Sequence, residues 1–585
     1  DGREVVDILD LVRMISKVQL PEYTLDFVAK KFIDESEGKL TWKGLPIANS
    51  LKKVWQEDPK LVIEYNKHDV ELCVQLDKKN DLINFLDMLR KQVGVRLTDA
   101  FSNQRMIDTE ALRRRTFPLP SKFKKDKEKP YRGALVVEPQ LGLESWIFSL
   151  DWRALYPTIM RTLNIDAETC VKKINPKLEY FVVKYEKTTI DKDGQKQVEK
   201  ILLRFKKEPR GLFPRMLDDW TYLREKLREE CKKEKDPEKK RLLDIKQEVI
   251  KVLTNATYGS FGYRSRAHSQ ECAEAITTVG QMFIKLVAQI AEEKGFKVIY
   301  GDTDSIFVKG TKESYDEVYE EGILLQKEIM ERIPKFLEQF NVHAKEHLFI
   351  INLEKIYESF FMSTKKRYCG RYLTENGMKD YDVKGLDSKR SDTSDFAAKL
   401  QKDLVEALLA GKGKEELEGT ILEKLNEIDK LPLKEIGVPS AVSMSFEKYK
   451  GNAIQKRAAE NANEYLNAHF EEGSKPRRLY IKVPTREEIH PRMGKKSEDE
   501  KRNIDVDLST LYVIAFDETV DLSKYPWLKV DYPRMIKLTV KPKLAKFLEA
   551  LEIPWGEIEK NLRLEFLKVA KRPKKTKDHS LEKWL

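Results

Sequence analysis

The spacing of hydrophobic and polar positions changes along the chain, and each change predicts a different element. Apolar residues recur with the helical period in Val54–Tyr65 and again in Val70–Lys91, so we expect mixed α/β structure over residues 1–95. By contrast, Ser145–Leu150 (SWIFSL) is a short apolar run with β character that ends at Asp151. The pattern therefore predicts a strand that presents a carboxylate at its end.

The longest helical pattern lies in a strongly charged segment, Asp218–Asn255. It is interrupted only at Asp236 and Pro237, and a proline at that point suits the first turn of a second helix that follows a tight turn. We therefore expect an antiparallel helical hairpin in this segment.

Two short β runs, Lys297–Tyr300 and Ser305–Val308, flank the sequence Gly301-Asp302-Thr303-Asp304. This arrangement predicts a strand–turn–strand hairpin with two acidic residues at the turn. After Arg390 the pattern is mostly helical, with a β patch near Arg478–Val483.

Composition narrows the class of protein. A chain of 585 residues is too long for one core, so several domains are expected. No apolar run approaches the length of a membrane span, and the chain opens with Asp-Gly-Arg-Glu, so we expect a cytoplasmic protein without a membrane partner. Lys and Arg exceed Asp and Glu by 109 − 98 = 11, which suits a polyanionic partner. The five scattered cysteines form no C-x-x-C pair, which argues against a zinc site.

Three carboxylates have the placement that phosphoryl transfer requires. Asp302 and Asp304 are two residues apart on extended chain, so their side chains share a face, and Asp151 could meet them across a sheet. Two Mg²⁺ ions about 3.5–4 Å apart can neutralise the attacking and leaving oxygens, and they require several converging carboxylates. An isolated Asp-x-Asp pair is more often a turn or the metal site of a sugar-nucleotide transferase.

The predicted helical hairpin carries clustered cations. Lys251, Asn255 and Tyr258 follow at i, i+4 and i+7 and line one face of the second helix, and Arg224 and Arg228 are one turn apart on the first. Arg224 and Lys251 both lie roughly 20 Å from the tip, so the two helices bring them close to opposite one another. Such a cluster of cationic side chains, which we call the cationic wall, is suited to bind a triphosphate. Single Arg or Lys residues, however, more often lie on a solvated helix surface.

Together these segments resemble the polymerase motifs of family B DNA polymerases, and the likeness is closest to archaeal members. Asp151–Ile159 (DWRALYPTI) is similar to the first motif, Lys251–Gly259 (KVLTNATYG) to the second and Tyr300–Ser305 (YGDTDS) to the third, in the order of the family. Tyr131-Arg-Gly-Ala, Lys365-Lys-Arg-Tyr and Lys384-Gly-Leu-Asp-Ser-Lys-Arg are also similar, so the resemblance covers nearly the whole chain.

The resemblance implies an α/β multidomain fold with right-hand polymerase architecture: an α/β palm, helical-hairpin fingers and a mostly helical thumb, with a partial exonuclease domain. The expected segments are the C-terminal part of a 3′–5′ exonuclease domain (residues 1–95), a connector (96–133), the first part of the palm (134–215), the fingers (216–268), the second part of the palm (269–392), the thumb (393–570) and a basic tail (571–585).

The resemblance also implies roles for the matched positions. The catalytic residues would be Asp151, Asp302, Asp304 and Lys251; two Mg²⁺ ions, which Mn²⁺ can replace, would be held chiefly by Asp151 and Asp304, with Asp302 flanking them and the Trp152 carbonyl assisting. The nucleotide would contact Arg224, Arg228, Lys251, Asn255, Leu155, Tyr156 and Tyr258, and primer–template DNA would contact Tyr131, Gly133, Lys365, Lys366 and Tyr368. The expected activity is template-directed extension of a DNA primer with dNTPs by a nucleotidyltransferase, at the nucleoid if the source is archaeal.

Tyr156 would be the steric gate, whose ring clashes with the 2′-hydroxyl of a ribonucleotide. Without the surrounding motif it would be an ordinary half-buried aromatic residue. The motifs also show departures: Ala154 and Ala256 replace the usual serines, and Thr158 follows Pro157 where serine is common. None of these positions is a proposed metal or phosphate ligand, so we expect altered fidelity or rate, and not loss of activity.

Both ends of the chain carry further resemblances. Tyr65-Asn-Lys-His-Asp69 is similar to the third motif of the family's proofreading exonuclease, whose two earlier motifs are not in this sequence. One remaining ligand cannot assemble a two-metal site, so we expect the chain alone to polymerise without proofreading. It could be a fragment of a longer protein, or a separate subunit could carry the rest of that domain. The last eight residues resemble a sliding-clamp-binding peptide, with Leu581, Trp584 and Leu585 as anchors and Asp578 where glutamine is usual. A disordered end is the simpler alternative.

Two other functions compete with the polymerase. A metal-dependent glycosyltransferase built around Asp302 and Asp304 leaves Asp151, Tyr156 and the Lys251–Gly259 helix unexplained. A non-catalytic DNA-binding scaffold has no reason to keep Asp151, Asp304 and Lys251 together. Primer extension separates both alternatives from a polymerase, whereas salt-sensitive DNA binding does not.

Overall fold

A computed structural model describes residues 4–15, 23–34, 40–42, 45–47, 51–115, 133–190, 196–262, 268–373, 379–386, 392–451, 453–489 and 508–563. The chain forms two compact units, which are considered separately: unit 1 comprises Asp1–Ser16 and Leu76–Asp382, and unit 2 comprises Lys17–Gln75 and Val383–Leu585. The predicted exonuclease segment is therefore divided between the two units. Among the described helices, none combines the length and the apolar character needed to cross a membrane.

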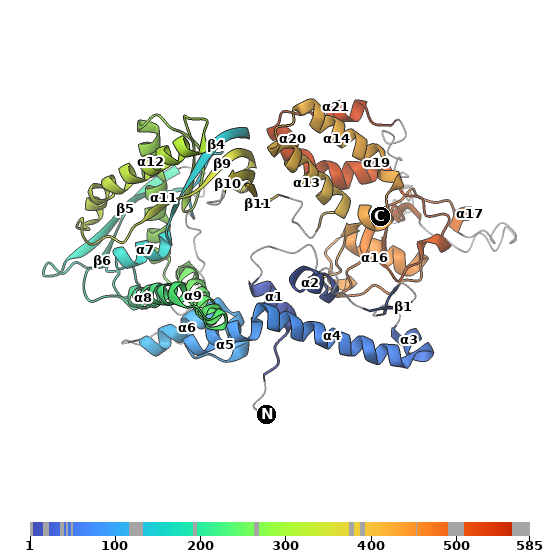
Figure 1. Ribbon diagram of the computed structural model, residues 1–585, viewed down its shortest axis with the longest axis horizontal. Coiled ribbons are helices and arrows are strands. Elements are labelled where there is room, and N and C mark those ends of the chain that lie inside the picture. The colour runs from blue at the N-terminus through green and yellow to red at the C-terminus, as the bar shows by residue number, and fades with distance from the viewer. Residues whose placement is uncertain are drawn as a thin grey trace, which may run out of the picture. The chain divides into compact units, whose positions relative to one another are not determined.

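A seven-stranded sheet forms the centre of unit 1 (Figure 1). Its strand order is β11 (Lys379–Lys384), β10 (Arg367–Leu373), β9 (Ile351–Thr364), β4 (Gly142–Trp152), β8 (Ser305–Lys309), β7 (Lys297–Asp302) and β3 (Val136–Val137). Neighbours from β10 to β3 are antiparallel. In β4, Ile147, Phe148 and Leu150 are fully buried, which explains why this strand shows as a continuous apolar run in the sequence.

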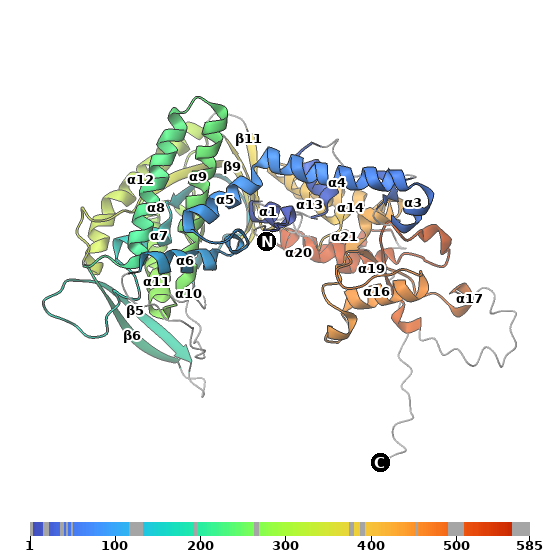
Figure 2. The ribbon, with the colours of Figure 1, turned by 90° about the horizontal axis from the view of Figure 1, so that it is seen from below.

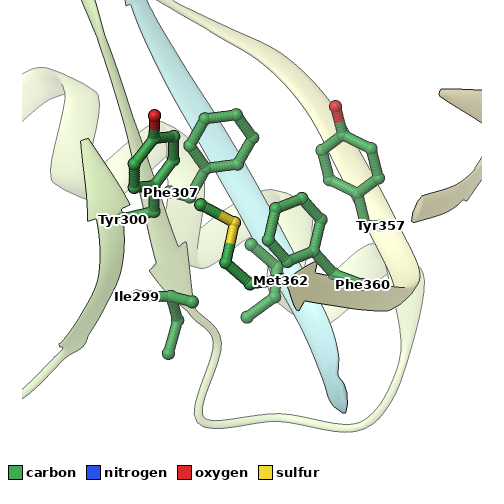
Figure 3. Packing of buried hydrophobic residues seen from close by; sticks show 7 residues of the cluster. Ile299, Tyr300, Phe307, Tyr357, Phe360 and Met362 are labelled. Carbon is green, nitrogen blue, oxygen red and sulfur yellow. The ribbon is translucent and has the colours of Figure 1, made fainter. Parts of the chain in front are cut away.

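Buried aromatic residues hold the strands of this sheet together. Figure 3 shows Tyr300 of β7, Phe307 of β8 and Phe360 and Met362 of β9 gathered in one cluster. The ring centroid of Phe307 lies 5.2 Å from that of Phe360 and 5.3 Å from that of Tyr368 on β10. Aromatic pairs at such distances stabilise packing beyond the area they bury, so this cluster gives the strands next to the acidic turn a rigid support.

Two long helices cover the sheet of unit 1. Helix α11 (Gln270–Glu293) packs against β7 and β8, and α12 (Tyr315–Leu337) packs against β4 and β9. The short helix α7 (Leu155–Thr162) follows β4 directly and packs on α11. Unit 1 also contains α1 (Ile8–Ile15), α5 (Leu82–Val93), α6 (Asn103–Arg114), α10 (Gly259–Gly262) and the two helices of the hairpin.

The predicted helical hairpin is confirmed. Helices α8 (Leu212–Lys233) and α9 (Pro237–Ala256) lie side by side in Figures 1 and 2 and pack along their lengths. The Asp236 carboxylate accepts hydrogen bonds from the Glu238 and Lys239 amides, and Pro237 occupies the first turn of α9. This capped start is the local signal that made the break between the helices visible in the sequence.

The loop after α7 anchors the start of α8. The Asn164 side-chain oxygen accepts from the Gly211 amide at 2.8 Å, and the buried Asp166 carboxylate accepts from the Phe213 amide at 2.8 Å. The Glu168 carboxylate accepts from the Leu212 amide at 2.6 Å. These bonds satisfy amide groups that a helix leaves without partners at its N-terminus, so α8 begins at a well-defined point.

Several elements were not predicted from the sequence, among them α11, α12 and β9–β11, and one helix break was misplaced. Strands β5 (Tyr180–Ile190) and β6 (Lys196–Lys206), which pair over their full length, were also not predicted. In the N-terminal segment, α3 (Leu51–Glu57) is followed by α4 (Pro59–Asn80), which runs through the predicted gap between Tyr65 and Val70. The chain breaks instead at Asp81, whose φ of 56° is left-handed and ends the helix.

Unit 2 is mostly helical, as expected for its C-terminal part. Its helices are α2 (Leu25–Phe32), α3, most of α4, α13 (Asp395–Leu409), α14 (Lys414–Asn426), α15 (Leu433–Ile436), α16 (Ile454–Tyr465), α17 (Arg486–Ile489), α19 (Tyr532–Met535), α20 (Lys541–Ala550) and α21 (Trp555–Lys560). Strands β1 (Thr41–Trp42) and β2 (Leu45–Pro46) pair, and β12 (Val438–Pro439), β13 (Arg477–Tyr480) and β14 (Val513–Phe516) form a sheet at the predicted β patch.

Candidate active site

The sheet of unit 1 brings two of the predicted carboxylates together. Asp151 near the end of β4 pairs in register with Ser305, the first residue of β8, so Asp304 in the β7–β8 turn is its near neighbour. The Trp152 amide donates to the Asp304 carbonyl at 2.8 Å and holds the turn against the end of β4. Thr303 has a φ of 57°, which lets the chain reverse within two residues. Asp151 and Asp304 therefore lie close together across the sheet, as the sequence suggested.

The two carboxylates share an environment that disfavours negative charge. Burial raises the pKa of Asp151 to about 7, and the nearby charges of Asp304 and Glu354 act in the same direction. Burial also raises the pKa of Asp304, with Asp302 and Glu354 adding to the effect and a backbone hydrogen bond opposing it. A bound cation stabilises the charged form of carboxylates that lie close together and are partly desolvated, and their oxygen atoms are the hard ligands that Mg²⁺ prefers.

Asp302 has a different environment from its two partners. Its carboxylate accepts from the Tyr300 hydroxyl at 3.2 Å and lies 3.3 Å from the Lys366 ammonium. The Lys366 amide in turn donates to the Tyr300 hydroxyl at 3.0 Å. Asp302 is thus tied to the β9–β10 turn, and Lys366, which sequence analysis assigned to DNA, here supplies a counter-charge to an acid of the third motif.

Glu354 is a fourth carboxylate that sequence analysis missed. In the β4–β9 pairing, Ser149 lies opposite Lys355 and Leu150 lies opposite Leu353, so Glu354 is the extra residue of a β-bulge. Bulges redirect side chains, and this one leaves Glu354 close enough to raise the pKa of both Asp151 and Asp304. Glu354 could be identified only from the pairing of β9 with β4, and the sequence around Glu354 does not predict that pairing.

The four acids do not all converge on one point. Across the described ranges, no three acidic, histidine or cysteine side chains are grouped closely enough to hold a metal ion as they stand. Asp151 and Asp304 lie close enough for their charges to interact, whereas Asp302 forms an ion pair with Lys366.

The cationic wall predicted for the hairpin has formed in part. The Arg224 guanidinium donates to the Gln247 side chain at 3.2 Å, one turn of α9 before Lys251, whose ammonium lies 3.2 Å from Glu248. Burial lowers the pKa of Arg224, with the nearby charge of Arg228 acting in the same direction. Arg228 itself is exposed. Arg224 and Lys251 therefore lie on facing helices at similar heights, as the spacing predicted.

Two tyrosines meet between α7 and the end of α9. The ring centroids of Tyr156 and Tyr258 are 4.6 Å apart and inclined at 51°. Asn255, one turn before Tyr258, is exposed, whereas the Leu155 side chain is only 2% exposed and packs in the core. Tyr156 and Tyr258 are thus in contact and Asn255 is exposed one turn away on the same segment, whereas the Leu155 side chain is buried.

The predicted DNA-contacting residues lie on elements that flank the acidic turn. The Gly133 carbonyl accepts from the Gln281 side chain at 2.5 Å, and the Lys365 ammonium lies 2.6 Å from Glu138. Tyr368 is half-buried beside Phe307, and burial raises its pKa. Tyr131 falls outside the described residues.

The remaining predicted residues lie away from these elements in the sequence. Tyr65 on α4 is 7% exposed and packs in a cluster with Ile47 and Val54. Asp69 follows one turn later on the same helix, and both belong to unit 2. The predicted clamp-binding residues Leu581, Trp584 and Leu585 lie outside the described residues.

Comparison with known proteins identifies the class. Residues 91–472 match the family model described as DNA polymerase family B. This match covers well over half of the chain, so the chain belongs to that family. It begins at the end of α5, so Tyr65 and Asp69 lie outside it.

Individual relatives agree with this assignment. The chain is similar to DNA polymerase 1 of Pyrococcus abyssi, with 29% identity over 421 residues that cover 70% of this chain and 49% of the relative. It is 33% identical to a DNA polymerase of Archaeoglobus fulgidus over 343 residues, which cover 57% of this chain and 38% of the relative. The chain thus spans about half the length, or less, of these relatives.

A solved structure shares the fold. The family B DNA polymerase of Pyrobaculum calidifontis superposes with a TM-score of 0.61 at 23% identity, covering 94% of this chain and 64% of that chain. At this identity the likeness supports the multidomain fold alone. The predicted right-hand polymerase fold is therefore confirmed at the level of architecture.

Proposed function

We propose that this chain is a DNA-directed DNA polymerase that extends a primer along a template by adding dNTPs. The observation that carries the proposal is the proximity of Asp151, near the end of β4, to Asp304, which directly precedes β8, in a chain of DNA polymerase family B. Both acids are half-buried beside other acids, and their pKa values are raised, which is the state expected of groups whose partner is a metal ion.

The proposed cofactor is a pair of Mg²⁺ ions, with Mn²⁺ as a substitute, held by Asp151 and Asp304 with help from Asp302 and the Trp152 carbonyl. When bound, the ions supply neutralisation of the charge on the attacking and leaving oxygens. Glu354 contributes negative charge beside the same pair. The carboxylates have to move together on binding, and release of Asp302 from Lys366 is part of that movement.

The hairpin and the tyrosines are proposed to bind the incoming nucleotide. Arg224, Arg228 and Lys251 hold the triphosphate, and the Lys251 ammonium exchanges its present partner Glu248 for a phosphate oxygen. Tyr258 and Asn255 frame the new base pair. Tyr156 lies beneath the sugar and excludes a 2′-hydroxyl by steric clash.

Duplex DNA is proposed to contact the turns that flank the acids. Gly133, Lys365, Lys366 and Tyr368, together with Tyr131, position the primer–template backbone without reading its sequence. Two of these lysines are held by acids, Lys365 by Glu138 and Lys366 by Asp302, so DNA phosphates compete with carboxylates for them.

Primer extension tests the polymerase directly. The purified chain should extend a labelled primer on a template with dNTPs and Mg²⁺, and Asp304→Ala should abolish extension while retaining DNA binding. Glu320→Ala, which removes an exposed acid from α12, is the matched control and should extend normally. Salt-sensitive DNA binding without extension by the unaltered chain would identify a DNA-binding scaffold, and sugar transfer without extension would identify a glycosyltransferase.

We further propose that residues 1–585 polymerise without proofreading on their own and bind the segment that carries the two earlier exonuclease motifs, whether that segment belongs to the same protein or to a separate subunit. An apolar face of α4 supports such binding, because Ile63, Val70 and Val74 are 61%, 57% and 46% exposed. A polypeptide carrying the two earlier exonuclease motifs should bind the chain and restore trimming of a mismatched primer end, and Val70→Lys should weaken that binding. Trimming by this chain alone contradicts the proposal.

The C-terminal anchors Leu581, Trp584 and Leu585 are proposed to bind a sliding clamp. Deletion of residues 578–585 should leave synthesis on short templates unchanged and abolish stimulation by the clamp. Clamp-dependent processivity that survives the deletion counts against the proposed clamp contact.

The archaeal relatives support a cytoplasmic, nucleoid-associated location. A fluorescent fusion that fails to colocalise with DNA would contradict this proposal.

A further inference from the structure

A glycine of α11 lies directly against the ring of Tyr156. A Cβ atom placed at Gly280 would be 2.9 Å from Cε1 and 3.6 Å from Cδ1 of that ring. Carbon atoms in contact normally keep about 3.5–4.0 Å apart, so no side chain fits at this position while the ring stays where it is. The Tyr156 ring therefore rests on the bare backbone of α11.

A glycine at this point is costly for the helix and needs a reason. Gly280 lies in the interior of a 24-residue helix, where glycine is the least favourable residue apart from proline. Its neighbours Ile276, Val279 and Phe283 are fully buried, so α11 is held firmly on both sides of the glycine. The helix backbone cannot retreat from the ring, and the contact with Tyr156 is the feature that requires the missing side chain.

The ring, in contrast, can move away from the helix. Tyr156 is half-buried, and Tyr258 lies 4.6 Å from it between ring centroids. A methyl group at position 280 would require a shift of about 0.6 Å, the difference between 2.9 Å and a normal contact of about 3.5 Å. Because α11 blocks one side, the ring has to shift away from the helix. Under the proposed function, this direction is toward the sugar of the bound nucleotide.

We propose that Gly280 is a positioning residue that sets the depth of the sugar pocket by letting the Tyr156 ring lie flush against α11. This inference rests on the proposed function, in which Tyr156 is the steric gate. Gly280 does not touch the substrate; it acts through the ring. A ring displaced by a fraction of an ångström narrows the pocket for deoxyribose and excludes ribose still more strongly.

The test compares steady-state incorporation of a dNTP and its rNTP by the wild-type chain, Gly280→Ala, Tyr156→Ala and the double variant. Gly280→Ala should raise the KM for dNTP by about tenfold with a smaller change in kcat, and should lower rNTP incorporation further. Tyr156→Ala should admit rNTPs. In the double variant the added methyl has no ring to displace, so its KM and sugar selectivity should equal those of Tyr156→Ala.

Gly322→Ala is the matched control. It also adds a methyl to a buried helical glycine, and its Cβ would lie 2.8 Å from Cδ1 of Leu353, a side chain that can rotate away. Sugar selectivity should be unchanged in this variant. If Gly280→Ala instead damages folding, removal of the ring in the double variant should rescue it, because the clash is with that ring.

Three results overturn the inference: a KM for dNTP within twofold of wild type in Gly280→Ala, an equal effect of that substitution with and without the Tyr156 ring, or a double variant that is not rescued. Failure of the proposed function is seen separately, as absence of extension by the wild-type chain. If Tyr156→Ala extends primers but does not incorporate more rNTP than the wild-type chain, Tyr156 is not the steric gate. The proposed role of Gly280 then fails as well.

Discussion

Protonation of Asp151 should make Mg²⁺ binding depend strongly on pH near neutrality. The pKa of this carboxyl is raised from 3.8 to about 7 by burial and by its acidic neighbours. A metal ion binds the deprotonated form, so protons and Mg²⁺ compete for the site. The affinity for Mg²⁺ therefore decreases as the pH falls through 7. Above pH 8 it is close to the value for the fully deprotonated site.

The size of the effect follows from the same value. With a pKa of about 7, competition weakens the apparent Mg²⁺ affinity about elevenfold at pH 6 and about 1.1-fold at pH 8. Binding should therefore release about 0.9 proton per site at pH 6 and about 0.1 at pH 8. The pKa of Asp304 is raised as well, so the combined change is at least this large.

Isothermal titration of the chain with Mg²⁺ measures both quantities. Titrations at pH 6, 7 and 8 in two buffers of different ionisation enthalpy give the affinity and the number of protons released. Asp151→Asn serves as the control and should bind weakly with little pH dependence. An affinity that stays constant from pH 6 to pH 8, or binding at pH 6 without proton release, refutes the electrostatic argument.

Three further outcomes follow from the site and its supports. Lys251→Ala should raise the KM for dNTP by more than about tenfold while DNA affinity stays the same, as measured by steady-state kinetics and a binding titration; equal loss of both contradicts a triphosphate role. Glu354→Gln should shift the pH midpoint of Mg²⁺ binding downward, because it removes a negative neighbour of Asp151. Asp166→Ala leaves the Phe213 amide without its acceptor and should cost about 1–3 kcal/mol, seen as a lower urea midpoint; an unchanged midpoint argues against the anchor.

Local signals in the sequence were sufficient for the elements that carry the predicted motifs. The apolar run that ends at Asp151 lies within β4, and the two β runs around Asp302 and Asp304 form β7 and β8. Pro237 marked the start of α9 because proline is favoured in the first turn of a helix and disfavoured in its interior. In each case the information lies within about ten residues of the feature it predicts.

Features that depend on pairing between distant segments were not accessible in this way. Glu354 comes near Asp151 only through the bulge in the β4–β9 ladder, and the Lys366–Asp302 ion pair depends on how the β9–β10 turn meets the β7–β8 turn. The β5–β6 ribbon was missed although Phe181 and Val183 of β5 are buried at alternate positions, which is a local strand signal. The role of Gly280 is visible only when its helix is packed on α7.

The anchored start of α8 has a mechanical consequence. Asn164, Asp166 and Glu168 hold the first amides of this helix, and Met216, Leu217 and Trp220 are buried further along it, so α8 is fixed to its surroundings as far as Trp220. Arg224 lies four residues beyond Trp220, or about 6 Å along the axis. A rotation of about 10° about Trp220 therefore moves the backbone of Arg224 by only about 1 Å. Under the proposed function, small angular motions of the hairpin leave this arginine within reach of the triphosphate, and its release requires a larger movement.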